Sequence, residues 1–329
     1  MDLSIIIVSW NVADLLAACL ESIAAAPVTR IAPDGVRLGN APLLVEVIVV
    51  DSASQDHTVD MVRERFPWVR LMPQNGNIGF TRGNNLGLAA ARGRLLLLLN
   101  PDTVVHGRAL NRLVEVLDCH PEAGIAGPHV LNTDGTTQST RRRFPTPITA
   151  LFESTWLQGY APRGILARYY VTDQPDDGIY EVDWVQGCAL IARREVYEQI
   201  GGLDPGYVMF SEEMDWCRRA KSAGWRVIYV GDAFITHHGG KSTEQAQAQM
   251  HIYFQQSKLR YFRIYHGRAI AAALRIFLLS SYVTQLLLES VKALLGSKRS
   301  MRRARIATYA QVIRALAAAA QTAPGENTT

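Results

Sequence analysis

Residues 95–102 constrain the fold more than any other stretch, because five consecutive leucines are followed there by Asn100, Pro101 and Asp102. A short apolar run between breakers is typical of a strand buried on both faces, as in the middle of a parallel sheet. Pro101 fixes one backbone angle and lacks an N–H donor, so the strand ends and Asp102 follows at its carboxyl end. Open α/β sheets bind ligands along that edge, although the stretch alone also fits a plain core strand and a turn.

Strands are expected to alternate with helices over the first 130 residues. Further runs of apolar and β-branched residues predict strands at 4–9, 45–50, 69–72 and 124–129. Apolar residues at helical spacing separate most of them, whereas the prolines and glycines of residues 27–42 predict a loop insertion. This order predicts an α/β fold with a Rossmann-like, doubly wound and mostly parallel sheet.

Three polar residues, Asn11, Asp51 and Asp102, follow the ends of the first, second and fourth strands. Right-handed crossovers would align those ends, so we expect the three side chains to face one crevice. Asp51 suits a base N–H or a ribose hydroxyl, whereas Asp56 fits a helix cap better. The Gly/Asn-rich loop at 75–85 offers unobstructed backbone N–H groups, which suit a nucleotide or its phosphates.

The second half of the chain is less regular. Residues 133–178, which include three consecutive arginines at 141–143, predict a flexible excursion over the site. Residues 182–192 predict a strand and residues 193–200 a short helix. A further helix is expected to begin near Ser211, before two strands at 225–230 and 233–236.

Two polar clusters carry candidate chemistry. Glu212, Glu213 and Asp215 put three acids within four residues, which fits a solvated helix N-terminus or, alternatively, a general base whose acidic neighbours raise its pKa. His237 and His238 fit either a structural role or divalent metal binding. The chain shows no GxSxG-type nucleophile motif and no zinc spacing, so a nucleotide, a metal and one base fit better than covalent catalysis.

The ordered set of motifs resembles the family 2 inverting glycosyltransferases with the GT-A fold, in their bacterial rhamnosyltransferase-like branch. The resemblance covers residues 4–242 and rests on seven segments: 4–11, 49–56, 77–87, 98–102, 201–204, 210–219 and 237–242. It implies a glycosyltransferase domain at 1–249, with a nucleotide-binding half to about residue 130 and an acceptor half after it. Residues 250–329 would then form a basic, apolar helical tail.

The resemblance also implies residue roles. It places Glu213 as catalytic base, with Glu212 as runner-up and Asp215 orienting the helix or contacting the acceptor. Asp102 and His237 would bind Mg²⁺ or Mn²⁺. Donor-binding positions would be Ser9, Asn11, Asp51, Asn77, Gly79, Arg82, Asn84 and Asn100. Arg82 substitutes for the arginine that many relatives carry at position 84, and Asn100 replaces the first acid of the Asp-X-Asp motif.

The implied reaction is metal-dependent, inverting transfer of a sugar such as rhamnose from a dTDP- or UDP-linked donor. Its acceptor would be a hydroxyl of a cell-envelope glycan or of a polyprenyl-diphosphate-linked glycan. Two alternatives stay open: a polyprenyl-phosphate sugar synthase, and a catalytically silent scaffold that binds nucleotide sugars. An ionised lipid phosphate needs no base, so the role of Glu213 separates the first alternative from the main hypothesis.

The C-terminal tail is basic, because residues 250–329 contain 12 Lys/Arg and two acids, whereas the first 249 contain 22 and 28. Residues 269–288 are long and apolar enough to span a bilayer, with Arg275 as their only charge. Basic residues on both sides favour helices that lie on the cytoplasmic leaflet. The less favoured alternatives are a membrane-spanning helix and a helix that packs within the protein or forms a homodimer. Nucleic-acid binding is not expected, since stacking aromatics do not interleave with the basic residues.

Cys19, Cys119, Cys188 and Cys217 are far apart in the sequence and form no CxxC pair. No basic, apolar signal segment opens the chain. These features predict reduced thiols and a cytoplasmic protein, peripheral on the inner face of the membrane.

Overall fold

The computed structural model describes residues 1–239, 247–296 and 298–318. These residues form two compact units. One unit comprises Met1–Phe144, Ala167–Val208 and Glu212–Ser242, and the other comprises Pro145–Leu166, Met209–Ser211 and Thr243–Thr329.

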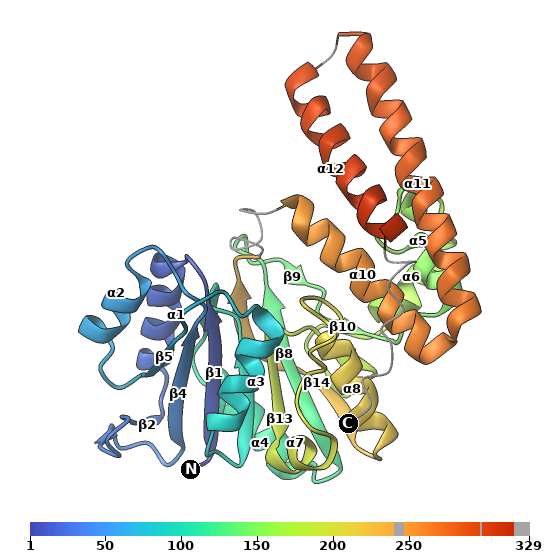
Figure 1. The fold of residues 1–329 in the computed structure, drawn as a ribbon. Coiled ribbons are helices and arrows are strands. Elements are labelled where there is room, and N and C mark those ends of the chain that lie inside the picture. The colour runs from blue at the N-terminus through green and yellow to red at the C-terminus, as the bar shows by residue number, and fades with distance from the viewer. Residues whose placement is uncertain (240–246, 297, 319–329) are drawn as a thin grey trace, which may run out of the picture. The chain divides into compact units, whose positions relative to one another are not determined.

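A twisted sheet forms the centre of the first unit (Figure 1). Its parallel part comprises β5 (Arg70–Pro73), β4 (Leu44–Asp51), β1 (Leu3–Ser9) and β6 (Leu95–Leu99). β13 (Ala189–Arg193) is inserted antiparallel between β6 and β8 (Ala123–Leu131), and β14 (Arg226–His237) runs parallel to β8. The predicted mostly parallel arrangement is therefore confirmed for the strands that carry Asn11, Asp51 and Asp102.

Shorter strands extend this sheet. They are β2 (Thr29–Ile31), β3 (Arg37–Leu38), β7 (Thr103–Val105), β9 (Thr137–Gln138) and β11 (Ile179–Val182). A separate two-stranded sheet joins β10 (Arg141–Arg142) to β12 (Trp184–Val185).

The leucine strand is buried on both faces, as the sequence predicts. Alternate residues of β6 and β1 pack with α1 (Ala13–Ala25), α2 (Thr58–Arg65) and α4 (Ala109–Cys119) in one continuous apolar core. On the opposite face, α3 (Phe80–Ala90) covers β1. The remaining helices of the unit are α7 (Arg194–Ile200) and α8 (Glu212–Ser222).

Two glycines let α3 lie close to β1. A Cβ added to Gly83 would lie 2.8 Å from Cγ1 of Val8, and one added to Gly87 would lie 2.3 Å from Cγ2 of Ile6. Both neighbours are β-branched and lie on a buried strand, so their methyl groups have little freedom to move. The separation of α3 from β1 therefore depends on the absence of side chains at positions 83 and 87.

Three segments differ from the sequence predictions. Residues 27–42, expected as a loop, contain the β2–β3 hairpin. Residues 182–192, expected as one strand, are divided into the end of β11, β12 and β13, because β12 pairs with β10 outside the main sheet. The two strands expected at 225–236 are one bulged strand, β14.

The second unit is helical. It contains the middle part of the excursion expected at 133–178, residues Pro145–Leu166, here as α5 (Pro147–Phe152), η1 (Trp156–Tyr160) and the start of α6 (Arg163–Tyr170). Three longer helices follow: α10 (Gln247–His266), α11 (Arg268–Leu294) and α12 (Arg299–Ala318). The predicted C-terminal helical extension is thus present.

We expect Gly87→Ala to lower the free energy of unfolding by roughly 1–3 kcal/mol, because the new methyl group overlaps Ile6 in a packed core. Chemical denaturation measures this change. Gly76→Ala is the matched control, since nothing lies within 4 Å of a Cβ at that position. Equal stability of the two variants would show that α3 can move away from β1 at no cost.

Candidate active site

The candidate site begins at the carboxyl ends of β4, β1 and β6, which are adjacent because β1 lies between the other two. Ser9 and Asp51, the last residues of β1 and β4, are direct partners in the parallel register. The N–H of Ser52 also donates to the carbonyl of Ser9, 2.8 Å away. The loops that begin here therefore start from a fixed edge of the sheet.

Asp51 is buried, with 1% of its surface exposed, and its carboxylate accepts hydrogen bonds from the N–H and hydroxyl of Ser54. The hydroxyl of Ser54 in turn accepts from the N–H of Asn11 at 2.9 Å. Asn11 has a left-handed backbone (φ 52°), and its side-chain oxygen accepts from the N–H of Gln55 at 2.7 Å. These bonds tie the loop after β1 to the loop after β4. The hydroxyl of Ser9 is buried without a hydrogen-bond partner.

The loop before α3 uses its own side chains to hold its backbone. The side-chain oxygen of Asn77 accepts from the N–H of Gly79 and from the hydroxyl of Ser52, and that hydroxyl accepts from the N–H of Ile78. The N–H groups at 78 and 79 are therefore engaged, whereas the sequence suggested an unobstructed phosphate cradle. Gly79 has φ 78° and precedes the first turn of α3.

The two candidate donor contacts on α3 point in different directions. Asn84 is buried, and its amide donates to the carbonyl of Phe80 within the same helix at 3.1 Å. Arg82 is exposed. The exposed guanidinium of Arg82, rather than the amide of Asn84, is thus available to an anionic ligand.

A second group of predicted residues meets where β6 ends. His237, at the end of β14, pairs in register with Thr103 of β7, which brings its ring beside the Asn100–Asp102 turn. Nε2 of His237 lies 3.3 Å from Oδ1 of Asp102 and 3.3 Å from Nδ2 of Asn100. The structure therefore brings together both predicted metal ligands and the amide that replaces the first acid.

Gln138, which sequence analysis missed, orients the ring of His237. Its side-chain oxygen lies 2.8 Å from Nδ1 of His237, and its amide donates to Asn132. An amide oxygen only accepts, so it places a proton on Nδ1 and leaves Nε2 with a lone pair facing Asp102. Nothing in the surrounding sequence singles out Gln138, because its role depends on the pairing of β9 with β8.

These residues fit a divalent ion. Among the described residues, Oδ1 of Asn100 is buried without a hydrogen-bond partner, and carboxylate, amide oxygen and imidazole are all suitable ligands. Over the residues that the structure describes, no group of three or more His, Cys, Asp and Glu side chains gathers into a metal site. Water and a ligand such as a diphosphate would have to complete the shell.

The acidic cluster lies at the start of α8. Glu212 is 3% exposed, and one carboxylate oxygen of each of Glu212 and Glu213 is buried without a hydrogen-bond partner. Burial raises the pKa of Glu212 well above its usual range, and the charge of Glu213 adds to this increase. Burial also raises the pKa of Glu213, against hydrogen bonds from backbone groups, including that of Gly187, and the charge of Arg142.

The turn at 186–188 connects the two groups of residues. The carbonyl of Cys188 accepts from the N–H of Asn100 at 2.9 Å, and a Cβ on Gly187 would lie 3.4 Å from Cβ of Glu213. Burial and the charges of Asp102 and Glu213 raise the pKa of the Cys188 thiol to about 12. The thiol is therefore neutral and lies close enough to both Asp102 and Glu213 to be affected by their charges.

Asp215 has a different environment from its two neighbours. Its carboxylate accepts from Nε of Arg219 at 2.7 Å, and the same guanidinium donates to the carbonyls of Ile200 and Gly202. The 201–204 segment is also held by Asn85, whose amide exchanges two hydrogen bonds with the backbone of Leu203. Asp215 thus helps to attach α8 to this segment, which in turn contacts α3.

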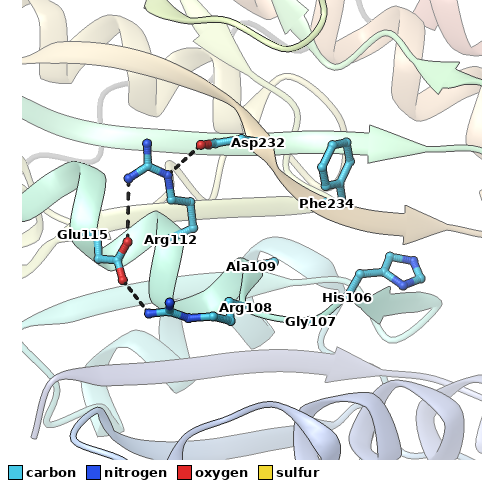
Figure 2. A pocket seen from close by; sticks show the side chains of 8 residues that line it. All are labelled: His106, Gly107, Arg108, Ala109, Arg112, Glu115, Asp232 and Phe234. Atoms are coloured by element: carbon cyan, nitrogen blue, oxygen red, sulfur yellow. Dashed lines mark hydrogen bonds and ion pairs between the residues drawn. The ribbon is translucent and has the colours of Figure 1, made fainter.

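A pocket of about 370 Å³ lies elsewhere in the sheet unit, between the start of α4 and β14 (Figure 2). Its charged residues pair with one another: Arg112 with Asp232 and Glu115, and Arg108 with Glu115. None of the predicted site residues lines it. We therefore do not assign the donor to this pocket.

The chain belongs to Glycosyl transferase family 2, whose sequence profile matches residues 4–201. It is a glycosyltransferase, an enzyme that transfers a sugar to a glycan acceptor. It is 28% identical over 211 residues to the N-acetylglucosaminyl-diphospho-decaprenol L-rhamnosyltransferase of Mycobacterium tuberculosis, covering 60% of this chain and 68% of that one. It is 26% identical over 210 residues to the rhamnosyltransferase WbbL of Escherichia coli K12, covering 56% and 70%.

The fold is GT-A. The mannosyltransferase PcManGT from Pyrobaculum calidifontis, solved with GDP-Man and Mn²⁺, matches with a TM-score of 0.51 and 19% identity, over 96% of this chain and 86% of that one. The expected family, its rhamnosyltransferase-like branch and the α/β fold are confirmed.

We expect Glu212→Gln to stabilise the folded protein increasingly as pH rises. Because the pKa of Glu212 is raised on folding, the folded state retains a proton that the unfolded chain releases above its ordinary pKa of about 4.3, so stability falls as pH rises through this window. Glutamine mimics the protonated acid and removes this loss of stability. We expect the variant to exceed wild type in free energy of unfolding by roughly 1 kcal/mol or more at about pH 8.

Urea denaturation of wild type and variant at about pH 4 and about pH 8 measures the effect. The exposed Glu195→Gln on α7 is the control and should change stability little at either pH. A Glu212→Gln variant that is less stable than wild type at the higher pH would contradict a protonated, buried Glu212.

Proposed function

We propose that this enzyme transfers rhamnose or a similar sugar, with inversion, from a dTDP- or UDP-linked donor to a hydroxyl of a lipid-linked or cell-envelope glycan. The observation that carries this proposal is the position of the 186–188 turn, with the Asn100–Asp102 edge on one side and Glu213 on the other. The M. tuberculosis relative is named for an acceptor of this lipid-linked kind, and PcManGT was solved with a nucleotide sugar and Mn²⁺.

In this proposal Asp102, His237 and the side-chain oxygen of Asn100 would hold Mg²⁺ or Mn²⁺. A divalent ion bound there would neutralise charge on the departing nucleoside diphosphate. Gln138 keeps the His237 ring turned with Nε2 toward Asp102, which is the usual function of a hydrogen-bond partner behind a metal ligand. Asp102 is the only carboxylate of this set, so the donor itself contributes much of the negative charge that holds the ion.

The nucleoside would lie along the ends of β1 and β4, against Ser9, Asn11 and Asp51. Their loops are already hydrogen-bonded to each other, so binding a donor costs little ordering of the backbone. Asn77 and Gly79 shape the adjoining loop, and the exposed cation of Arg82 suits the diphosphate. Asn84 supports the helix from within.

Glu213 is the proposed base. Its carboxylate takes the proton of an acceptor hydroxyl, whose oxygen attacks the anomeric carbon, while the nucleoside diphosphate leaves from the opposite side with the electron pair of the broken C–O bond. A raised pKa makes this carboxylate a stronger base than an exposed glutamate. Glu212 retains a proton beside it, so a second full charge need not form, and Asp215 positions α8.

We place the reaction on the cytoplasmic face of the membrane that carries such an acceptor. The cysteines at 19, 119, 188 and 217 are all free, which suits a compartment that keeps thiols reduced.

Replacing Glu213 with glutamine should lower kcat by at least about 10²-fold while leaving donor affinity within a few-fold, because only the proton acceptor is removed. Transfer from radiolabelled dTDP- or UDP-sugars to a lipid-linked acceptor, together with donor titration, measures both. Glu212→Gln is the matched control and should retain transfer. If only Glu212→Gln lost transfer activity, Glu212 would be the base instead of Glu213. Near wild-type turnover in Glu213→Gln would favour a lipid phosphate as acceptor.

Asp102→Asn should abolish the Mn²⁺-dependent part of donor binding. A panel of dTDP- and UDP-sugars, with and without Mn²⁺, is tested for its effect on the thermal midpoint, since a ligand that binds only the folded state raises it.

Gln138→Leu should weaken the Mn²⁺ effect by roughly 10-fold or more, since the His237 ring loses its orientation. Equal donor stabilisation with and without Mn²⁺ in the wild type would contradict the proposed metal site.

A further inference from the structure

We propose that α11 lies in the plane of an anionic lipid bilayer and inserts its exposed apolar face into the headgroup region. This goes beyond the transfer reaction, because it assigns a binding surface that lies wholly within the helical unit. Over the described residues, α11 is the one helix long and apolar enough to cross a membrane. The contacts of α11 decide between crossing the membrane and lying on it.

The two faces of α11 have opposite environments. Its buried residues are Ala271, Leu274, Leu278, Ser281, Tyr282 and Glu289, which share one side of the helix. The other side exposes large apolar side chains along the whole helix: Ile276 is 66% exposed, Leu287 58% and Leu294 81%. Ile270, Val283, Leu288, Val291 and Leu295 are also exposed. We call these eight residues the α11 apolar face.

Charged side chains near the apolar stretch turn away from this face. Arg275, the only charge in residues 269–288, donates to the carbonyls of Leu316 and Ala317 at the end of α12. Glu289 is buried and pairs with Arg302 of α12 at 2.7 Å. Arg275 and Glu289 therefore do not interrupt the α11 apolar face, although both lie within the apolar stretch of the sequence. Ser280 and Thr284 are the exposed polar residues on that side of the helix, which has 27 residues and is about 40 Å long.

The same contacts argue against a transmembrane α11. The pairs 275–316, 282–309 and 289–302 show that α12 runs antiparallel along α11 for most of its length. α12 exposes Arg299, Arg303 and Arg314. Hydrocarbon on all sides of α11 would draw these charges into the bilayer, where a charged side chain is strongly disfavoured. A helix with one covered side and one apolar side instead suits the membrane interface.

Charge selects anionic lipid rather than a second copy of the chain. Exposed Arg263 and Arg268 lie before the apolar face, and exposed Lys298, Arg299 and Arg303 lie after it. Any symmetric pairing of two such faces brings basic ends together, which is repulsive. Anionic headgroups instead attract the basic residues at both ends of the α11 apolar face.

Binding of the full-length protein to vesicles tests this proposal without donor or acceptor, so its outcome is independent of the proposed reaction. We expect it to sediment with vesicles of phosphatidylcholine and phosphatidylglycerol, less with phosphatidylcholine alone, and less at high salt. Leu287→Glu should weaken binding by at least about 10-fold, since it places a charge where an apolar side chain inserts. Arg299→Glu with Arg303→Glu should weaken it by a similar factor, mainly at low salt.

Val36→Glu, which places the same charge on an exposed apolar position of the β2–β3 hairpin region, is the matched control and should bind as wild type does. Circular dichroism and thermal midpoints establish that the variants remain folded. Three results would overturn the proposal: no binding to anionic vesicles at low salt, extraction only by detergent, or a dimer in solution that Leu287→Glu dissociates.

Discussion

The hydrogen bond from the N–H of Asn100 to the carbonyl of Cys188 joins two parts of the sheet unit that are far apart in the sequence. It extends the antiparallel pairing of β6 with β13 by one step beyond the last ladder pair, Leu99 with Ala189. The leucine strand therefore fixes Asp102 on one side, and the 186–188 turn fixes the surroundings of Glu213 on the other. Because β13 runs antiparallel to β6, the turn that precedes β13 lies next to the end of β6. The inserted antiparallel strand therefore brings the Asn100–Asp102 edge close to the turn that contacts Glu213.

The electrostatics of the site follow from this packing. Glu212 at the start of α8 is buried, the half-buried Glu213 lies beside Gly187, and desolvation raises the pKa of both. Asp102 is also buried, but it faces the ring of His237. The site thus separates a region suited to holding a cation from a region suited to exchanging a proton, with a neutral thiol near both.

Much of this arrangement could be predicted from the sequence because it depends on local patterns. The leucine run, the β-branched strands and the turn after each of them identify the parallel sheet and the edge at which Asn11, Asp51 and Asp102 emerge. The insertion of β13 could not be predicted, because an apolar strand shows no direction in its sequence. Gln138 and the pairing of Asp215 with Arg219 depend on contacts between segments far apart in the chain or on a specific rotamer. The predicted site roles themselves remain proposals.

The three residues that precede α8, Met209–Ser211, belong to the helical unit although the helix itself belongs to the sheet unit. The carbonyl of Met209 accepts from the hydroxyl of Ser257 on α10, the ring of Phe210 packs edge-on against Phe254, and both Phe210 and Ser211 have left-handed backbones. The helix α10 therefore packs on the peptide that leads into α8. A chain truncated before α10 would lose these contacts at the residues just before Glu212 and Glu213, whereas single substitutions on α11 leave them in place.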